Sequence, residues 1–250
     1  MIDNTAFKKE LEERVKEINA GIAGYLPEEK GCQKTIFEAM NYSMNAGGKR
    51  LRPLLMQEVC RLFTGEVSEI VKPFMAAIEM IHTSSLVHDD LPCMDDDMIR
   101  RGKASTWAEY GEDIGVLAGD ALMMYAFETA SKAFDAAEDA DALLRAGKAM
   151  GILAAKTGVY GMIGGQTVDV ELAGGPVPKD KLDFIYRLKT GALLQAAMLI
   201  GAVLGGAADE DCKIVEDLAG KVGLAFQIQD DILDVTSTAE ELGKPVHSDE

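Results

Sequence analysis

Eight aspartates fall into two tight clusters, one in each half of the chain. The first cluster holds five carboxylates in nine residues and the second holds three: Asp89, Asp90, Asp95, Asp96 and Asp97, then Asp230, Asp231 and Asp234. Like charges this close repel one another unless water or cations surround them. Carboxylate oxygens together with water suit Mg²⁺, so the clusters suggest a metal site. A solvated acidic loop is the alternative for either cluster taken alone.

Both clusters lie against apolar segments with a helical pattern. The first follows a predicted helix over 72–88, where the negative end of the helix dipole worsens the repulsion. In the second, Asp230 and Asp234 are four residues apart and share a helix face. Ile228 just before the acids and Ile232 between them indicate that this helix is mostly buried. Two such clusters on apolar helices favour bound cations over two solvated loops.

Basic residues stand close to both clusters along the sequence. Gly47-Gly48 precede three cations at the start of a predicted helix, where backbone N–H groups and arginine forks suit a phosphate. The basic residues concerned are Lys49, Arg50 and Arg52, then Arg100 and Arg101, then Lys189, and finally Lys244. No GxxxxGK[ST] nucleotide loop occurs in the sequence. Each cation alone has a simple surface interpretation, but together with bound Mg²⁺ they suggest a diphosphate bridged to the protein through metal.

Hydrophobic periodicity predicts helices along almost the whole chain. The expected helices lie at about 11–18, 36–44, 51–63, 72–88, 113–134, 141–160, 179–204 and 211–235. No segment alternates at period two over a strand's length, and no hairpin signal is visible. We therefore expect a single all-α domain of about ten helices. The nearly uncharged stretch after Lys189, interrupted by Gln195, is interpreted as a buried central helix and not as a membrane span.

Composition sets wider bounds on function. The 250 residues carry 25 Lys+Arg against 42 Asp+Glu, a formal charge of −17. This acidity argues against binding nucleic acid or an anionic membrane through overall charge. Four scattered cysteines lack the spacing of a zinc site, and the N-terminus lacks the pattern of a signal peptide. We expect a cytoplasmic protein with reduced thiols.

The motifs, taken in order, resemble those of the trans-prenyl diphosphate synthases, the short-chain polyprenyl synthase family. The matching segments are GGKRLRP (47–53), HDDLPCMDDDMIRRG (88–102), GGQTVD (164–169), KTG (189–191), FQIQDDILDV (226–235) and GK (243–244). The two Asp motifs together with GGKRLRP are highly specific, whereas either Asp motif alone is shared with terpene cyclases. The resemblance implies the isoprenoid synthase fold, a large helical bundle around a deep central cavity with the Asp motifs facing each other across its mouth.

The resemblance also implies roles for single residues. By similarity, three Mg²⁺ ions would be bound by Asp89, Asp95 and Asp230, with Asp90, Asp231 and Asp234 orienting these ligands or holding metal-bound water. The allylic diphosphate would be held by Arg100, Lys189, Thr190, Gln227 and Lys244. The isopentenyl diphosphate would be held by Lys49, Arg52, His82 and Arg101. Without the resemblance, His82 would be interpreted as a core histidine.

The implied reaction joins isopentenyl diphosphate to dimethylallyl, geranyl or farnesyl diphosphate. Metal-triggered ionisation would give an allylic carbocation, which the isopentenyl double bond attacks before a proton is lost to the departing diphosphate. Ser84 and Ser85, five and four residues before Asp89, would form part of the cavity floor. Five residues of helix span ~7.5 Å, so a bulky side chain there would stop chain growth early. The absence of an aromatic residue at Ser84 slightly favours a C20 geranylgeranyl product over C15 farnesyl. Met123, Met124 or Phe127 from another helix is the alternative floor.

Other interpretations remain open at this point. Relatives continue beyond the Gly-Lys motif, so we expect the single domain 1–250 to lack its closing C-terminal helices. A terpene cyclase would share the ionisation step but has no second diphosphate to hold, and Lys49, Arg52 and Arg101 argue against it. A non-catalytic partner subunit usually loses one Asp motif, and this chain keeps both. An acidic bundle without catalysis is the remaining alternative. The resemblance implies a homodimer.

Overall fold

The structure, a computed structural model, describes residues 4–236, apart from the side chains of Asp230, Asp231, Asp234 and Val235. The predicted site residue Lys244 lies outside the described residues. The elements, in order, are α1 (Asn4–Ala23), α2 (Lys34–Met44), α3 (Leu51–Thr64), the 3₁₀ turn η1 (Glu69–Val71), α4 (Lys72–Asp89), β1 (Ile99–Arg100), β2 (Lys103–Ala104), α5 (Thr106–Tyr110), α6 (Glu112–Asp135), α7 (Ala140–Thr157), α8 (Met162–Leu172), α9 (Lys179–Ile185), the π turn η2 (Tyr186–Thr190), α10 (Gly191–Leu204) and α11 (Asp209–Thr236). The expected all-α fold is confirmed, while the deep central cavity stays a prediction.

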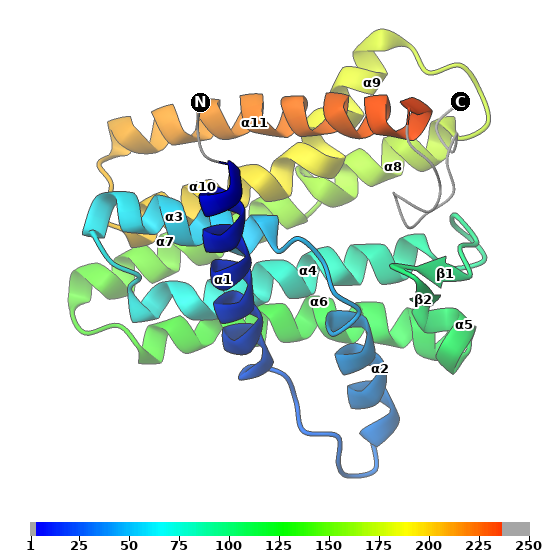
Figure 1. Ribbon diagram of the computed structural model, residues 1–250, viewed down its shortest axis with the longest axis horizontal. Coiled ribbons are helices and arrows are strands. Elements are labelled where there is room, and N and C mark those ends of the chain that lie inside the picture. The colour runs from blue at the N-terminus through cyan, green and yellow to red at the C-terminus, as the bar shows by residue number, and fades with distance from the viewer. Residues whose placement is uncertain (1–3, 237–250) are drawn as a thin grey trace.

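The helices form a bundle whose long members run roughly side by side (Figure 1). α4 packs along α6, and α10 packs against α3, α7 and α11. α1 crosses the bundle and contacts α3 and α4. α4, α8 and α11 all run toward the end of the bundle that carries the β1–β2 hairpin (Figure 1). Residues far apart in the sequence therefore meet at that end.

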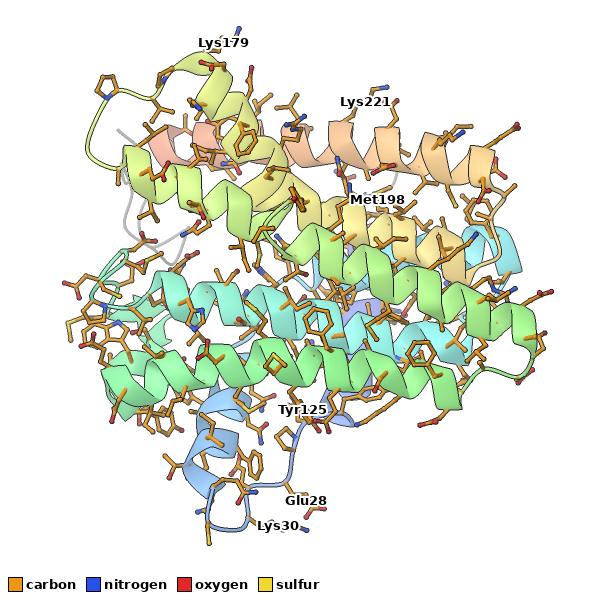
Figure 2. The ribbon with its side chains drawn as sticks, turned by 180° about the vertical axis from the view of Figure 1, so that it is seen from behind. Glu28, Lys30, Tyr125, Lys179, Met198 and Lys221 are labelled. Carbon is orange, nitrogen blue, oxygen red and sulfur yellow. The ribbon has the colours of Figure 1, made fainter. Side chains whose placement is uncertain are left out.

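α10 is the central helix that the sequence predicted. Residues Lys179–Leu204 are long and apolar enough to cross a membrane by length and composition alone, but 72% of the apolar window is buried inside the protein. Met198 points from α10 toward α11, where it packs with Ala202, Val215 and Ala219 (Figure 2). Lys221, by contrast, points away from the bundle on the outer side of α11 (Figure 2). Burial among other helices explains the apolar composition of α10.

The expectation that no hairpin occurs is wrong at one place. β1 and β2 pair Ile99 with Ala104 and Arg100 with Lys103. The connecting residues Arg101 and Gly102 both have positive φ, 54° and 76°, as a two-residue turn of the type favoured in hairpins requires. Strands of two residues are too short for alternation to appear in the sequence.

Two helices were also missing from the prediction. α5 has only five residues, and α8 includes Gly164 and Gly165, which weaken a helical signal. The predicted helix over 141–160 ends at Thr157, because Gly158 leaves the helical conformation. The four cysteines are free thiols, as expected.

The contact between α3 and α10 depends on a glycine. A Cβ at Gly201 would overlap the carbonyl oxygen of Met56, whereas a Cβ at Gly147 of α7 would meet nothing within 4 Å. We predict that Gly201→Ala lowers the free energy of unfolding by about 1–3 kcal/mol because it forces the two helices apart. Gly147→Ala should instead raise it by about 0.5–1 kcal/mol, since alanine is the better helix former. Urea unfolding of both variants measures this, and equal effects would contradict the packing argument.

Candidate active site

The first Asp cluster begins at the C-terminal end of α4 and folds back on it. Asp89 is the last residue of that helix, and its carbonyl oxygen accepts a hydrogen bond of 2.9 Å from the backbone N–H of Asp95. The backbone N–H of Asp96, which has φ of 54°, bonds to the carbonyl oxygen of Leu91 at 3.1 Å. These backbone bonds hold Asp95 beside Asp89 despite the repulsion between their carboxylates.

Asp90 is buried and is paired with Arg100 of the hairpin. The Arg100 Nε donates to Asp90 Oδ1 at 2.8 Å, and the Arg100 Nη2 contacts the same oxygen and also Asp97 Oδ2, the latter at 3.1 Å. Burial raises the pKa of Asp90, and the guanidinium of Arg100 opposes this rise. Asp90 thus anchors the hairpin to α4. Arg100, predicted to contact the allylic diphosphate, is bound to the acidic loop in this structure.

α8 connects Asp89 to Lys189. Gln166 Nε2 donates to Asp89 Oδ1 at 2.7 Å, and the ammonium of Lys189 lies 2.6 Å from Asp169 Oδ2. Gln166 and Asp169 are three residues apart, so they lie on one face of the helix. The sequence reasoning gave neither residue a role, although both belong to the matched GGQTVD segment.

A glycine of α8 allows this helix to approach the π turn that carries Lys189. A Cβ at Gly165 would overlap the backbone nitrogen of Lys189 and lie 2.8 Å from the carbonyl carbon of Leu188. Short π segments occur frequently at functional sites. The close approach places the Lys189 ammonium among the acids instead of out in solvent.

Asp89, Asp95, Asp169 and Lys189 form an acidic subsite whose charges are only partly balanced. Burial raises the pKa of Asp89 to about 6; Lys189 lowers it in part, while Asp95 raises it further. Burial also raises the pKa of Asp95. Burial would lower the pKa of Lys189, but Asp169, Asp89 and Asp95 outweigh this effect and raise it. A charged lysine therefore faces carboxylates whose burial is not fully compensated.

These oxygen donors fit a hard divalent cation. The predicted ligands Asp89 and Asp95 lie together, whereas the Asp230 side chain lies outside the described residues. Among the side chains that the structure describes, no group of three His, Cys, Asp or Glu residues is gathered closely enough to hold a metal ion by itself. A third ligand from α11 is thus required if the predicted set is correct.

α11 is tied to the π turn by a side-chain hydrogen bond. Thr190 Oγ1 donates to Gln227 Oε1 at 2.8 Å. Both residues were predicted from the resemblance, and the structure brings them together across 37 positions. Asp230 follows Gln227 by nearly one helical turn, and Figure 1 shows this end of α11 at the end of the bundle that carries the hairpin. Asp231 and Asp234 follow on the same helix, and their side chains are likewise outside the described part.

A second subsite is rich in cations and includes Arg101 of the same hairpin, together with Arg52 and His82. Arg101 donates to the carbonyl oxygen of Gly47, and a Cβ at Gly48 would lie 2.9 Å from the Arg101 guanidinium. Burial lowers the pKa of His82 well below its usual range, and the charges of Arg52 and Arg101 lower it further. His82 is therefore a neutral ring among guanidinium groups.

Three of the four residues predicted to bind isopentenyl diphosphate thus lie close together, namely Arg52, His82 and Arg101. The Arg52 Nε is buried and has no hydrogen-bond partner among the described residues. Lys49 is exposed at the turn into α3. Arg100 is the last residue of β1 and bonds to Asp90 of the acidic subsite, whereas Arg101 lies in the turn and bonds to the Gly47 carbonyl oxygen beside the cationic one.

The predicted floor residues lie on α4. Ser84 is fully buried, and its hydroxyl has no partner among the described residues. Ser85 Oγ donates to the His82 carbonyl oxygen at 2.9 Å. Of the alternative floor residues, Met124 is 69% exposed on the single chain. Met123 and Phe127 are half-buried. The role of Ser84 in chain length stays a prediction.

The sequence is similar to those of known prenyl diphosphate synthases. A farnesyl diphosphate synthase of Geobacillus stearothermophilus is 40% identical over 240 residues, covering 96% of this chain and 79% of that protein. The heterodimeric geranylgeranyl pyrophosphate synthase large subunit 1 of Arabidopsis thaliana is 46% identical over 217 residues, covering 86% of this chain and 58% of that protein. The chain therefore spans about three fifths of the length of the plant relatives it matches.

Solved structures agree with the sequence relatives. A geranyltransferase from Helicobacter pylori, complexed with magnesium and isoprenyl diphosphate, superposes with a TM-score of 0.83 at 32% identity, covering 100% of this chain and 81% of that one. An FPP/GFPP synthase from Zymomonas mobilis gives a TM-score of 0.84 at 34% identity, covering 94% and 83%. The family profile described as polyprenyl synthetase matches residues 33–250. With most of its length matched by that profile and by close relatives of the same fold, the chain belongs to the polyprenyl synthetase family.

Proposed function

We propose that the protein is a short-chain trans-prenyltransferase that joins isopentenyl diphosphate to an allylic diphosphate. One observation carries this proposal: a cluster of acids around Asp89 and a cluster of cations around His82 meet at one hairpin, whose Arg100 bonds to Asp90 and whose Arg101 bonds to the Gly47 turn. The allylic diphosphate, which leaves on ionisation, needs the acidic subsite for metal ions. The isopentenyl diphosphate needs the cationic subsite. A terpene cyclase, the alternative, has no use for the cluster of Arg52, His82 and Arg101. The Helicobacter pylori relative, complexed with magnesium and isoprenyl diphosphate, supports the same substrates.

Asp89, Asp95 and Asp230 would hold Mg²⁺ in the acidic subsite, three ions in all as the family resemblance implies. When bound, Mg²⁺ supplies the positive charge that stabilises the diphosphate as it leaves. Lys189 is charged and oriented by Asp169, so it would neutralise further diphosphate oxygens. Gln166 would hold the Asp89 carboxylate in one orientation.

The cationic subsite would orient the second substrate. Arg52, Arg101 and the exposed Lys49 would bind the isopentenyl diphosphate, and the neutral His82 would donate a hydrogen bond to it. The double bond would then point toward the carbon that loses diphosphate. The proton released after attack would go to the departing diphosphate, so the chain need not provide a general base.

Assembly, location and product length are also proposals. We infer a homodimer, which agrees with large apolar side chains exposed on α6 and α7, including Leu117, Met124, Leu143 and Leu144. Light scattering measures the assembly directly. We infer a cytoplasmic protein with a C20 product.

The proposed activity predicts how the first Asp motif affects turnover. We expect the wild type, incubated with Mg²⁺, labelled isopentenyl diphosphate and each allylic primer, to form longer prenyl diphosphates. Asp89→Ala should reduce the rate by a factor on the order of 10³ or more with the fold intact, because metal-assisted ionisation is lost. Circular dichroism checks the fold. A rate near that of the wild type would contradict the metal assignment, and a cyclic product would favour a terpene cyclase.

The raised pKa of Asp89 predicts a stability effect in the metal-free protein. With a folded-state pKa of about 6 against an ordinary value of 3.8, the carboxylate destabilises the fold at pH 7.5, and this penalty fades as the pH falls from about 6 toward 4. We expect Asp89→Asn in EDTA to raise the melting temperature by about 2–4 °C at pH 7.5 and to leave it unchanged near pH 4.

Two controls accompany this measurement. Asp183→Asn, at an exposed position of α9, should leave the melting temperature unchanged at both pH values. Added Mg²⁺ should stabilise the wild type more than Asp89→Asn, since the variant lacks one ligand charge. A lower melting temperature for Asp89→Asn at pH 7.5 would show that the carboxylate is already compensated in the folded chain.

The burial of Ser84 on α4 leads to a prediction about the length of the product. Ser84→Tyr should shorten the main product by one or more isoprene units, because a buried aromatic ring would fill space beside α4. Chromatography of the dephosphorylated products measures the length, with Ser131→Tyr at an exposed position of α6 as the control. An unchanged product from Ser84→Tyr would remove Ser84 from the floor.

A further inference from the structure

Arg50 lies in the sequence between two predicted diphosphate ligands, Lys49 and Arg52, but its side chain bonds to residues outside the predicted ligand set. It begins α3 with φ of 48°, in the left-handed region that residues with a Cβ adopt only at a cost. The residues on either side of Arg50 differ in exposure. Lys49, which precedes it, is exposed, whereas Arg52, which follows it in the first turn of α3, is partly buried beside His82. The left-handed residue thus stands between an exposed cation and a buried one.

Three hydrogen bonds hold the Arg50 side chain. Its Nη1 donates to Glu79 Oε1 at 2.7 Å, its Nη2 to the Met44 carbonyl oxygen at 2.6 Å, and its Nε to Asn19 Oδ1 at 2.7 Å. The acceptors come from α4, α2 and α1. The side chains of Arg50 and Glu79 are only 3% and 2% exposed. A strained backbone persists where its surroundings fix it this fully.

Glu79 also acts on the cations of the subsite itself. It lies three residues before His82 on α4, so the two share a helix face. Burial lowers the pKa of Arg52 and of Arg101, and for both residues the charge of Glu79 opposes that effect most strongly. The carboxylate thus counters part of the repulsion between these guanidinium groups, although the charge of Arg50 adds to that repulsion at Arg101.

We propose that Arg50 and Glu79 are positioning residues for the cationic subsite: the pair fixes the left-handed turn that sets Lys49 and Arg52 apart around one diphosphate. The inference rests on the proposed function, because the diphosphate is that of the isopentenyl substrate. It adds a role for two residues that do not themselves contact substrate.

Arg50→Lys tests the pair while keeping its charge. A lysine still reaches Glu79, but its single ammonium cannot replace a planar fork that bonds three helices. We expect the KM for isopentenyl diphosphate to rise about tenfold, which is the order of one lost hydrogen bond to a charged group. The KM for the allylic substrate should stay within about twofold, since none of the hydrogen bonds of Arg50 reaches a residue of the allylic subsite. Titration with inorganic diphosphate in EDTA should show the same weakening of diphosphate binding, because the metal-dependent subsite does not bind diphosphate without Mg²⁺.

Asn19→Ala gives a second test that keeps the ion pair intact. It removes one acceptor from α1, outside both subsites, and should raise the KM for isopentenyl diphosphate selectively by about threefold. Arg61→Lys, at the exposed end of α3, is the matched control and should change neither KM. If Arg50→Lys does not fold, Asn19→Ala still decides the question.

The outcomes separate this inference from the proposed function. Unchanged constants in both variants, or equal rises for the two substrates, would overturn the positioning role while leaving the wild-type activity in place. A wild type that forms no prenyl product and binds no inorganic diphosphate would overturn the proposed function instead. A selective rise in both variants, absent from Arg61→Lys, supports the inference.

Discussion

Crowded charge at the end of α4 is the constraint on which the site depends. Asp89 and Asp95 lie at the negative end of a helix dipole, and burial raises the pKa of both. The surrounding elements act against this repulsion. Backbone bonds fold the loop onto α4, Gln166 donates to Asp89, and Lys189 faces the acids from the π turn. A divalent cation would neutralise the negative charge that remains uncompensated.

The two arginines of the hairpin bind different partners. Arg100 is bound to Asp90 and Asp97, whereas Arg101 is bound to the glycine turn before α3. The cationic side has the complementary problem, since Arg52 and Arg101 lie close together, and the buried Glu79 relieves it. Each subsite thus contains charge of the opposite sign, Lys189 and Arg100 in the acidic subsite and Glu79 in the cationic one.

The sequence predicts the helices because their apolar faces repeat at helical spacing. It fails where packing overrides local preference: α8 forms around two glycines that let it approach the π turn, and the hairpin strands are too short to alternate. The motifs predict Asp89, Lys189 and Arg101, but not their partners. Gln166 lies 77 positions from Asp89, and no local pattern joins them. Likewise, the three cations Lys49, Arg50 and Arg52 suggest one phosphate site in the sequence. In the structure Arg50 has a left-handed backbone conformation, and its side chain is buried against Glu79.

The central claim is that one chain holds two diphosphate subsites and that only one of them depends on metal. Calorimetric titration of the full chain with inorganic diphosphate tests this most directly. We predict one diphosphate bound per chain in EDTA and two in the presence of Mg²⁺, the second removed by Asp89→Ala. A single site that appears only with Mg²⁺, or an unchanged stoichiometry after Mg²⁺ is added, would contradict the account.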